Sequence, residues 1–436
     1  MKAVILAGGK GTRMGDLTKE IPKPMLEISG KPILLHQLEV LKRSGCLDIT
    51  LIIGHLGEVI ENYFGDGSKY GVNINYILED EPLGTAGALF LLKDEIKEDF
   101  IFLFGDIFLD IDFNAMMKFH KEESSALTMF VHPNSHPYDS DLVKVKGKKV
   151  VDIDFKSNTR DYNYNNLVLA AVYIASPRIF NYITEKKKTA FEKDIIVNMI
   201  NNSEAVKIYK STEYSKDMGT PERYDQTTKD YNSGLTNDRN LQNKQSCIFL
   251  DRDGTINEHV GFLNNHSQFK LIDGVAKAIA KINHSKFLCI VLTNQPVIAR
   301  GEMTLDELDE THKKMETLLG NERAYVDAIY YCPHHPNKGY EGEVPELKFD
   351  CECRKPKTGM MLAAAKDYNI DLSKSYMIGD TTLDIMLAKN AGVKSILVKT
   401  GEKGMDGKYD VQADFESETL LDAVENILKE EEKNGF

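Results

Sequence analysis

Near the middle of the chain stands the sequence Cys247-Ile248-Phe249-Leu250-Asp251-Arg252-Asp253-Gly254-Thr255-Ile256-Asn257. It joins an apolar run, typical of a buried strand, to a turn that carries two carboxylates one residue apart. Ligands of α/β sheets bind beyond the carboxyl ends of the strands, so Asp251 and Asp253 are expected at a binding edge. There, one carboxylate can act as a nucleophile, and the other as an acid and then as a base.

Three later segments supply the groups that such a nucleophile needs. Thr293 and Asn294 follow a second apolar run and offer a hydroxyl and an amide to phosphate oxygens. Lys355 supplies a fixed positive charge, and Asp380, with Asp384 one helical turn later, supplies acid for a metal ion. A carboxylate attacks a phosphate dianion poorly unless a cation cancels the repulsion, so magnesium is implied. Alone, Asp-x-Asp-Gly is often only a turn or a calcium-type loop, but its companions in order favour the catalytic interpretation.

A cysteine- and histidine-rich segment lies between these groups and contains Cys332, His334, Cys351 and Cys353. Three thiolates and one imidazole in this spacing suit a closed, tetrahedral Zn²⁺ site. Because protein ligands would fill every position, the predicted role of zinc is structural, and it would order a loop that lacks regular structure. His334 is preferred to His335 as the ligand because of its pairing with Cys332. A redox or disulfide cluster is the alternative, and the absence of a secretory signal disfavours it.

The N-terminal half opens with an expected strand, Ala3–Leu6, and the loop Gly8-Gly9-Lys10-Gly11-Thr12-Arg13. Glycines let backbone N–H groups approach a phosphate chain, and the guanidinium of Arg13 matches phosphate oxygens in a fork. Lys23 stands between two prolines, which limit the freedom of its loop. The pattern is neither a Walker A sequence nor a dinucleotide fingerprint, so neither mechanism applies.

Two carboxylates from distant segments complete the N-terminal set. Asp106 follows the apolar run Ile101–Phe104, and Asp217 comes just before a turn and a predicted helix start. Two such carboxylates can hold one Mg²⁺ that bridges phosphates. Each feature alone has an ordinary explanation as a turn or a surface charge, and only their ordered co-occurrence favours a binding site.

Strands and helices alternate in both halves, which predicts two α/β domains. The apolar periodicity stops in the polar, loop-like stretch Tyr231–Ser246. We therefore expect domains over residues 1–231 and 246–436, joined by a linker over 232–245. The expected elements are Ala3–Leu6, Leu34–Ser44, Ile49–Ile53, Glu58–Phe64, Phe100–Phe104, Cys247–Leu250, Phe287–Leu292, Leu305–Leu319, Ala328–Tyr331, Gly359–Tyr368, Ser375–Ile378 and Ser395–Val398.

Composition limits the classes of partner. A chain of 436 residues with a formal net charge of −13 argues against nucleic acid or an anionic membrane as the main partner, and favours small-molecule substrates. No apolar stretch has the length of a membrane span, and the N-terminal apolar residues lead directly into a glycine turn without a cleavage site. The cysteine pattern favours a reducing cytoplasm. Whether the chain forms a homo-oligomer stays open.

The N-terminal motifs together resemble the sugar-1-phosphate nucleotidyltransferase family. They are the Gly8–Arg13 loop, Lys23-Pro24, Pro82-Leu83-Gly84-Thr85-Ala86, Gly105-Asp106 and the Asp217–Glu222 turn. The resemblance implies a Rossmann-like domain with a mixed, mostly parallel sheet, and attack of a sugar-1-phosphate oxygen on the α-phosphorus of a nucleoside triphosphate. Arg13 and Lys23 would hold phosphates, and Asp106 and Asp217 would hold Mg²⁺. The nucleotide would contact Gly8, Gly9, Gly84 and Thr85.

Two positions depart from this family. Relatives carry Glu-Lys against the sugar phosphate where this chain has Phe155-Lys156, so Lys156 alone carries over as a substrate contact. Relatives carry Ala-Gly before a strand where this chain has Ala170-Ala171. Both departures fall in the sugar subsite, so they bear on the identity of the sugar rather than on the reaction class.

The C-terminal motifs resemble the haloacid-dehalogenase phosphatase superfamily, which implies a Rossmannoid α/β domain. Asp251 would become an aspartyl-phosphate, hydrolysed by water with Asp253 as base, and Thr293, Asn294 and Lys355 would contact the phosphate. Mg²⁺ would be held by Asp251, Asp380 and the backbone carbonyl of Asp253. With the zinc loop, Ala299-Arg300-Gly301 and Cys353-Arg354-Lys355-Pro356, the resemblance narrows to heptose-bisphosphate phosphatases, with histidinol-phosphate phosphatases as neighbours. Arg300 and Arg354 would then contact a distal phosphate. Pro296 and Thr381 depart from the usual pattern.

The presence of both resemblances in one chain restricts the choice of substrate. A heptose-bisphosphate 7-phosphatase makes heptose 1-phosphate, which a sugar-1-phosphate nucleotidyltransferase can consume. The expected activity is therefore removal of the 7-phosphate of D-glycero-D-manno-heptose 1,7-bisphosphate, followed by transfer of GMP from GTP. The alternatives are a mannose- or glucose-1-phosphate nucleotidyltransferase fused to a histidinol-phosphatase-like enzyme, and a regulatory nucleotide-binding module without turnover fused to a phosphatase.

Overall fold

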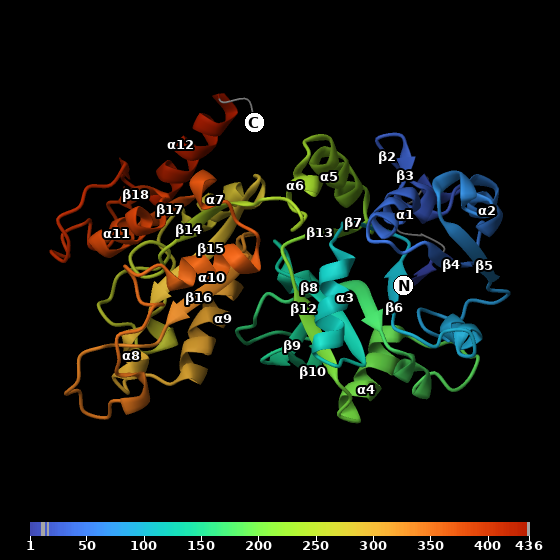
Figure 1. Cartoon of the computed structure of the whole chain (residues 1–436), viewed down its shortest axis with the longest axis horizontal. Helices are drawn as coiled ribbons and strands as arrows, with labels where there is room; N and C mark the ends of the chain where they lie inside the picture. Colours follow the sequence, from blue (N-terminus) through green and yellow to red (C-terminus); the bar gives the residue numbers. More distant parts are fainter. Residues whose placement is uncertain (10–13, 15–16, 434–436) are drawn as a thin grey trace. The chain divides into compact units, whose positions relative to one another are not determined.

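The computed structural model describes residues 1–9, 14 and 17–433 (Figure 1). The chain packs into two compact units. The first contains residues 1–132, 141–155 and 167–240, and the second contains 133–140, 156–166 and 241–436. Each unit is an α/β structure built on its own sheet, as the alternating sequence pattern predicts.

The first unit is built on a mixed sheet with the strand order β5-β4-β1-β6-β11-β8-β12-β10-β9. β10 and β11 run opposite to the other strands of this sheet, and the pairs among β5, β4, β1 and β6 are parallel. The sheet is therefore mixed, as expected. Parallel pairing is limited to β5-β4-β1-β6 and β8-β12, and the other pairs are antiparallel. The strands are β1 (Lys2–Leu6), β4 (Asp48–Ile53), β5 (Asn73–Leu78), β6 (Phe100–Phe104), β8 (Leu127–His132), β9 (Leu142–Lys146), β10 (Lys149–Asp154), β11 (Val168–Ala175) and β12 (Val206–Lys210).

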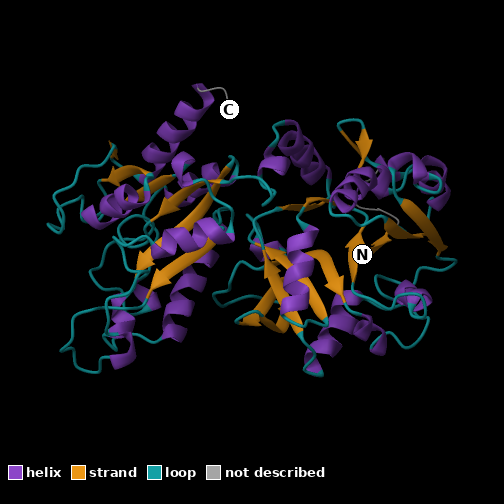
Figure 2. Ribbon diagram, viewed as in Figure 1, coloured by secondary structure: helices purple, strands orange, loops and turns teal. Residues whose placement is uncertain are grey.

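Both faces of this sheet are covered. In β1, Ala3 and Ile5 belong to one apolar cluster and Val4 to another, because successive strand side chains point to opposite faces. Helices and short turns pack on the two sides (Figure 2). The helices are α1 (Ile33–Arg43), α2 (Gly57–Phe64), α3 (Phe113–Glu122), α4 (Val197–Asn201), which follows a π-turn (Phe191–Ile196), α5 (Pro221–Asn232) and α6 (Leu235–Asp238). Two small sheets pair β7 (Ile107–Asp110) with β13 (Tyr214–Asp217) and β2 (Glu27–Ile28) with β3 (Lys31–Pro32).

The second unit has a parallel sheet with the order β16-β15-β14-β17-β18-β19. Its central strand β14 is buried on both faces, with Ile248 and Leu250 in one apolar cluster and Cys247 and Phe249 in the other. The strands are β14 (Ser246–Leu250), β15 (Phe287–Asn294), β16 (Ala328–Cys332), β17 (Tyr376–Gly379), β18 (Lys394–Val398) and β19 (Phe415–Ser417). The helices are α7 (Val275–Asn283), α8 (Pro296–Ala299), α9 (Leu305–Asn321), α10 (Gly359–Asp367), α11 (Thr382–Ala391) and α12 (Leu420–Lys433).

The stretch expected to be a loop between the domains is partly helical. α5 continues to Asn232, and α6 follows Gly234, which adopts a left-handed φ of +84°. Asn240 Nδ2 donates to Asp110 Oδ1 at 2.7 Å, so side-chain contacts hold this polar segment in place of an apolar face. Apolar periodicity therefore failed to detect it. Within the described part of the chain, no helix has both the length and the apolar character needed to span a membrane.

Candidate active sites

A carboxylate–lysine cluster forms where the strands of the second unit end. Asp251 follows β14, Asp380 follows β17, and Asp384 lies in the first turn of α11. One carboxylate oxygen from each of the three lies within 4.8 Å of the others. Lys355 Nζ lies 2.7 Å from Asp251 Oδ1 and 2.7 Å from Asp384 Oδ1. The structure thus brings together the groups expected around the nucleophile.

The charges of this cluster are unbalanced. Burial, followed by repulsion from Asp384, raises the pKa of Asp251 to about 7. Burial, followed by repulsion from Asp251, raises the pKa of Asp380 to about 8. Burial alone would lower the pKa of Lys355, but Asp251 and Asp384 outweigh it and raise the pKa. One lysine therefore does not neutralise the three carboxylates, and a second cation is favoured.

Asp380 offers a direct sign of where that cation fits. Its Oδ2 accepts a hydrogen bond from Glu402 N at 2.8 Å. Its Oδ1 is buried and has no hydrogen-bond partner among the described residues. An unsatisfied buried carboxylate oxygen is costly, and oxygen ligands from carboxylates are what Mg²⁺ prefers. The donor set of Asp251, Asp380 and Asp384 therefore fits a magnesium ion.

Asp253 is held as an anion by neighbours from three directions. Arg252 Nη2 donates to Oδ1 at 3.0 Å and to Oδ2 at 2.8 Å, Asn257 Nδ2 to Oδ1 at 3.0 Å, and Gln295 Nε2 to Oδ2 at 2.9 Å. Burial alone would raise the pKa of Asp253, but the charge of Arg252 and these hydrogen bonds outweigh it and lower the pKa. An ionised carboxylate beside the nucleophile suits a general base.

Thr293 and Asn294 occupy the last two positions of β15, so they end the strand rather than follow it. Thr293 Oγ1 accepts from Gln295 Nε2 at 2.8 Å, which leaves its own O–H to donate. Asn294 exchanges hydrogen bonds with the backbone of Lys355: its Nδ2 donates to the carbonyl at 3.2 Å, and its Oδ1 accepts from the N–H at 3.0 Å. Asn294 thus fixes the loop that carries Lys355.

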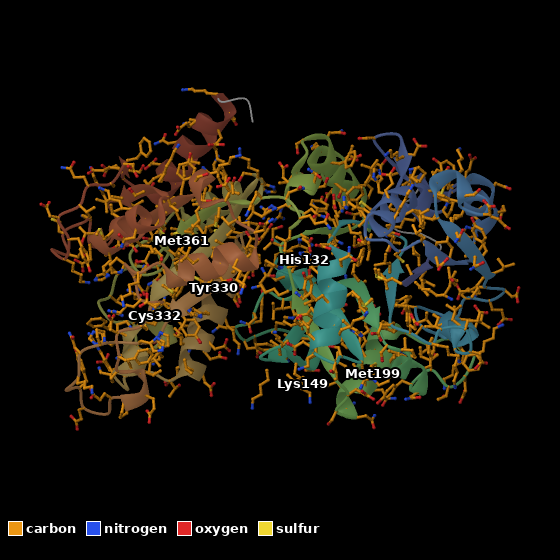
Figure 3. All side chains as sticks on the ribbon, viewed as in Figure 1. His132, Lys149, Met199, Tyr330, Cys332 and Met361 are labelled. Atoms are coloured by element: carbon orange, nitrogen blue, oxygen red, sulfur yellow. The ribbon has the colours of Figure 1, made fainter. Side chains whose placement is uncertain are left out.

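The four predicted zinc ligands meet beyond β16, at whose end Cys332 is labelled in Figure 3. Cys353 Sγ lies 3.3 Å from both Cys332 Sγ and Cys351 Sγ, and 3.2 Å from His334 Nδ1. Tetrahedral Zn–S bonds of about 2.3 Å require sulfur–sulfur separations of roughly 3.7 Å, so small adjustments would admit the ion. His335 turns away, and its Nδ1 lies 3.3 Å from the carbonyl of Asn337.

The predicted distal-phosphate arginines lie beside this loop. Arg300 is 9% exposed and stacks on aromatic rings, with its Cζ 3.9 Å from the ring centroid of Phe262 and 4.6 Å from that of Tyr340. Arg354 Nη1 donates to the carbonyl of His334 at 3.2 Å. Both guanidinium groups are thus held by the loop that carries the predicted zinc ligands.

In the first unit, Gly8 lies close to two other chain segments, those of Gly54 and Glu79. A Cβ on Gly8 would lie 2.7 Å from Glu79 Oε2 and 3.2 Å from Gly54 N, so a larger residue here would require the Glu79 side chain and the backbone at Gly54 to shift. Apart from its chain neighbours, no described atom lies within 4 Å of where a Cβ on Gly9 would be. Arg13, the predicted phosphate ligand of this loop, lies outside the described residues.

Lys23 joins the two carboxylates predicted to hold a metal ion. Its Nζ lies 2.5 Å from Asp106 Oδ2 and 3.5 Å from Asp217 Oδ1. Asp217 is also paired with Arg223, on the first turn of α5. The chain segments that carry Asp106 and Asp217 meet through Met218 N, which donates to the carbonyl of Asp106 at 3.0 Å. Two carboxylates with oxygens in reach of one amino group can also share a divalent cation.

The predicted nucleotide loop packs against the π-turn. A Cβ on Gly84, whose φ is +76°, would lie 2.5 Å from the carbonyl oxygen of Thr189. Thr85 Oγ1 accepts from Phe191 N at 2.7 Å. The loop of Gly84 and Thr85 thus packs against residues 189–191. Gly84 serves packing here, and its predicted contact with a nucleotide stays a prediction.

The two departures in the sugar subsite have different structural outcomes. Lys156 lies in the segment that packs with the second unit, and its Nζ is 3.8 Å from Asp139 Oδ1, so its predicted contact with a sugar phosphate stays a prediction. Ala171 adopts a φ of +51° at an irregularity of β11, a conformation that glycine favours. The backbone at this position is therefore left-handed although the residue is alanine.

Different known proteins resemble the N-terminal and the C-terminal halves of the chain. The model of the nucleotidyl transferase family matches residues 2–234, which is more than half of the chain. The D-glycero-beta-D-manno-heptose-1,7-bisphosphate 7-phosphatase of Haemophilus ducreyi is 40% identical over 182 residues, which cover 97% of that protein and 41% of this chain. The chain belongs to both families. The HAD-hydrolase-like family also matches residues 352–423.

Each half of the chain also resembles other proteins. The 7-phosphatase of Escherichia coli K12 is 39% identical over 187 residues, covering 95% of that protein and 42% of this chain. The crystal structure of HddC from Yersinia pseudotuberculosis is 26% identical and covers 53% of this chain and 99% of that chain, with a TM-score of 0.46. We call the carboxylate–lysine cluster with Asp253 and Thr293 the phosphatase site, and the group of Gly8, Lys23, Asp106 and Asp217 the transferase site; both are candidate sites.

Sequence reasoning missed three polar partners in this bifunctional chain. Arg252 is fully buried and binds Asp253, and His312 Nε2 on α9 lies 3.4 Å from Arg252 Nη1. Burial, followed by the charge of Arg252, lowers the pKa of His312 to about 3, so this imidazole is neutral. Glu79 reaches Gly8 from the end of β5. Arg252 stood in the motif itself and could have been found, but nothing local marks His312 or Glu79.

Proposed function

We propose that this chain makes a nucleotide-activated heptose in two steps. The phosphatase site removes the 7-phosphate of D-glycero-D-manno-heptose 1,7-bisphosphate. The transferase site then transfers GMP from GTP to the heptose 1-phosphate and releases pyrophosphate. The observation that carries the proposal is the cluster of Asp251, Lys355, Asp380 and Asp384, in a chain that also belongs to the nucleotidyl transferase family.

Asp251 is the proposed nucleophile of the first step. Its Oδ1 accepts hydrogen bonds from Arg252 N at 2.6 Å and from Lys355 Nζ at 2.7 Å. We therefore assign the attack on phosphorus to Oδ2. The new bond between Asp251 and phosphorus replaces the bond to the sugar oxygen, which takes a proton from the protonated form of Asp253 as it leaves. Lys355 and the Thr293 hydroxyl would bind the phosphate oxygens. Bound Mg²⁺, held by Asp251, Asp380 and the carbonyl of Asp253, would neutralise the negative charge of the phosphate.

Asp253 completes the hydrolysis. In the second half-reaction, a water molecule attacks the phosphorus of the aspartyl-phosphate and gives its proton to Asp253, which restores Asp251 and releases inorganic phosphate. The lowered pKa of Asp253 suits this role, because Arg252 and Gln295 keep the carboxylate ionised. Arg300 and Arg354 would hold the phosphate that stays on the sugar.

The transferase site would position two anionic substrates. Lys23 and Arg13 would bind phosphate oxygens, and Asp106 and Asp217 would hold Mg²⁺, which lowers the charge on the triphosphate. An oxygen of the sugar 1-phosphate attacks the α-phosphorus, and pyrophosphate leaves. The support is the distance of Lys23 Nζ from both carboxylates, 2.5 and 3.5 Å, which places three charged groups at one point.

We propose Glu79 as the residue that reads guanine. Its Oε1 accepts from Leu83 N at 3.1 Å, while Oε2 faces Gly8 of the phosphate-binding loop. The Watson–Crick edge of guanine presents two adjacent donors, which a carboxylate matches in a paired geometry. Uracil and thymine present one donor between two carbonyl groups, which a carboxylate repels, and adenine presents an acceptor beside its donor.

The remaining assignments follow from these sites. We assign zinc a structural role in the Cys332–Cys353 loop, because four protein ligands leave no position for a substrate. Six free cysteines, with three of them in that cluster, favour the cytoplasm. The domain limits 1–231 and 246–436 stay a proposal, and within the proposed linker the first compact unit extends to residue 240.

A nucleotide panel tests the transferase assignment. Purified full-length protein is given heptose 1-phosphate, Mg²⁺ and each of GTP, ATP, UTP and dTTP, and products are separated by chromatography. GTP should be used best, and Glu79→Gln should reduce kcat/KM for GTP by roughly 10- to 100-fold, the size of one lost charged hydrogen-bond pair. Turnover of mannose 1-phosphate but not of heptose 1-phosphate would refute the heptose assignment.

A further inference from the structure

Arg300 has an unusual environment for a buried arginine. Its guanidinium Cζ lies 3.9 Å from the ring centroid of Phe262 and 4.6 Å from that of Tyr340. Its Nε is buried without a hydrogen-bond partner, and no ion pair of Arg300 occurs among the described residues. Aromatic faces therefore hold this cation in place of a carboxylate, which leaves its N–H groups for an anion.

Tyr340 is itself fixed by two charged residues. Glu343 Oε2 accepts hydrogen bonds from Gly339 N at 2.9 Å and from Tyr340 N at 3.0 Å. Lys348 Nζ lies 3.4 Å from Glu343 Oε2 and 4.4 Å from the ring centroid of Tyr340. The side chain of Lys348 is fully buried. These contacts hold both the backbone and the ring of Tyr340.

The loop that carries Tyr340 docks closely on the segment that carries Arg300. Val344 N donates to the carbonyl of Ala299 at 3.0 Å. Gly301 adopts a φ of +74°, and a Cβ there would collide with the carbonyl of Gly342, so only glycine permits this approach. The other end of the loop is anchored by the Cys332, His334, Cys351 and Cys353 cluster. The loop thus connects the predicted zinc ligands to Arg300.

Positive charge gathers around the ring of Tyr340. The edge of the His335 ring meets Tyr340 with 5.6 Å between centroids. Arg300 Cζ and Lys348 Nζ lie 4.6 Å and 4.4 Å from the centroid of the Tyr340 ring. Arg354 directly precedes Lys355, the lysine of the phosphatase site. A concentration of cations next to a phosphate-cleaving centre attracts a second phosphate of the same substrate.

We propose that Tyr340 and Lys348 are positioning residues, which hold the guanidinium of Arg300 in place for the phosphate that is not hydrolysed. The proposal rests on the proposed phosphatase function. Phe262 closes the other side of the guanidinium. The ligand class is a sugar with two phosphates, recognised by its distal phosphate through Arg300.

Steady-state kinetics of the full chain test this proposal with heptose 1,7-bisphosphate and with p-nitrophenyl phosphate, which has no second phosphate. Tyr340→Leu should raise KM for the bisphosphate roughly fivefold to thirtyfold, the factor expected when a desolvated cation–π contact is lost. Its kcat, and both constants for p-nitrophenyl phosphate, should stay near wild type. Tyr340→Phe should restore the wild-type KM, and Lys348→Met should give a smaller increase. Tyr409→Leu, at an exposed tyrosine outside this cluster, is the matched control.

The result that overturns the proposal is distinct from the result that overturns the phosphatase function. If the wild-type chain shows no preference for the bisphosphate, the proposed function and the proposal both fail. If the wild type shows the preference and Tyr340→Leu keeps it, only the proposal fails. It also fails if Tyr340→Leu lowers activity equally on both substrates or if Phe does not restore KM, since either result indicates a structural role. Zinc content and thermal unfolding of each variant identify folding damage.

Discussion

The phosphatase site and the transferase site both gather carboxylates around one lysine, but they differ in burial. In the phosphatase site, the side chains of Lys355, Asp251 and Asp384 are 3%, 10% and 0% exposed. In the transferase site, Lys23 is 7% exposed, while Asp106 and Asp217 are 32% and 40% exposed. Water can screen the charges of Asp106 and Asp217, but it cannot reach the buried carboxylates of the phosphatase site. The phosphatase site should therefore depend more strongly on a bound cation for its stability.

The largest expected effect separates the two activities. Asp251→Asn removes the nucleophile and should lower phosphatase kcat by roughly 10⁴-fold or more, because no other group can form the covalent intermediate. Transferase activity on heptose 1-phosphate should be unchanged. Phosphate release and pyrophosphate release from one preparation measure both. A parallel loss of the two activities would contradict independent sites.

Lys23→Met tests the transferase site in the opposite sense. Removing the cation that contacts Asp106 and Asp217 should lower transferase kcat/KM by roughly 10²- to 10³-fold, the usual cost of one lost electrostatic contact to a transferring phosphoryl group. Phosphatase activity should be kept. Lys31→Met, at a half-exposed lysine paired with Glu39 in the same unit, serves as the control. Equal behaviour of the two variants would remove Lys23 from the site.

The zinc loop should respond to loss of a single ligand. Wild-type protein should contain about one tightly bound zinc ion per chain, and Cys353→Ser should release it, because a structural site needs all four ligands. Elemental analysis after dialysis against a chelator measures the metal. Cys46→Ala, at a buried cysteine of the first unit, should keep the zinc. Zinc-free wild-type protein that retains full stability would contradict a structural role.

The smallest expected effect is a pH-dependent stabilisation by magnesium. In the metal-free protein, the pKa values of Asp251 and Asp380 are raised from 3.8 to about 7 and about 8. A carboxyl whose pKa is raised by folding stabilises the fold fully below its unfolded pKa, and this contribution is lost as pH rises through the folded pKa. The metal-free phosphatase domain should thus weaken as pH rises from about 6 to about 8.5.

Mg²⁺ should offset this loss, and more so at the higher pH, because it binds the ionised carboxylates. At roughly 100 times its Kd, a ligand adds about 3 kcal/mol to the stability of the folded state. Thermal unfolding with Mg²⁺ and with EDTA at the two pH values measures the difference. Asp380→Asn should abolish most of it. Stabilisation that is equal at both pH values would contradict a site built on these two carboxyl groups.

The difference between the sites also shows what sequence can predict. Asp251 and Asp380 were predictable because each follows a short apolar run that reads as a strand, and parallel strands end at one edge. The strand order of the first sheet was not predictable, because β11 pairs with β6 and β8, which lie far from it in sequence. Local periodicity contains no information on such long-range pairing.

Side-chain partners show the same limit. Glu79 meets Gly8 and Tyr340 meets Arg300 only after the chain has folded, and neither pair has a fixed spacing. The polar segment of α6 lacks the apolar stripe from which helices are predicted. Motif spacing correctly predicted that side chains from strand ends or from one compact loop meet, as with Cys351 and Cys353.

The central claim is that two cation-assisted sites act in succession on one sugar. The most direct test is a time course of full-length protein with heptose 1,7-bisphosphate, GTP and Mg²⁺, in which phosphate, pyrophosphate and nucleotide sugar are followed together. We predict that phosphate appears first, and that pyrophosphate and GDP-heptose follow in equal amounts after a lag. Pyrophosphate released without prior phosphate, or phosphate released with no nucleotide sugar formed, would contradict the claim.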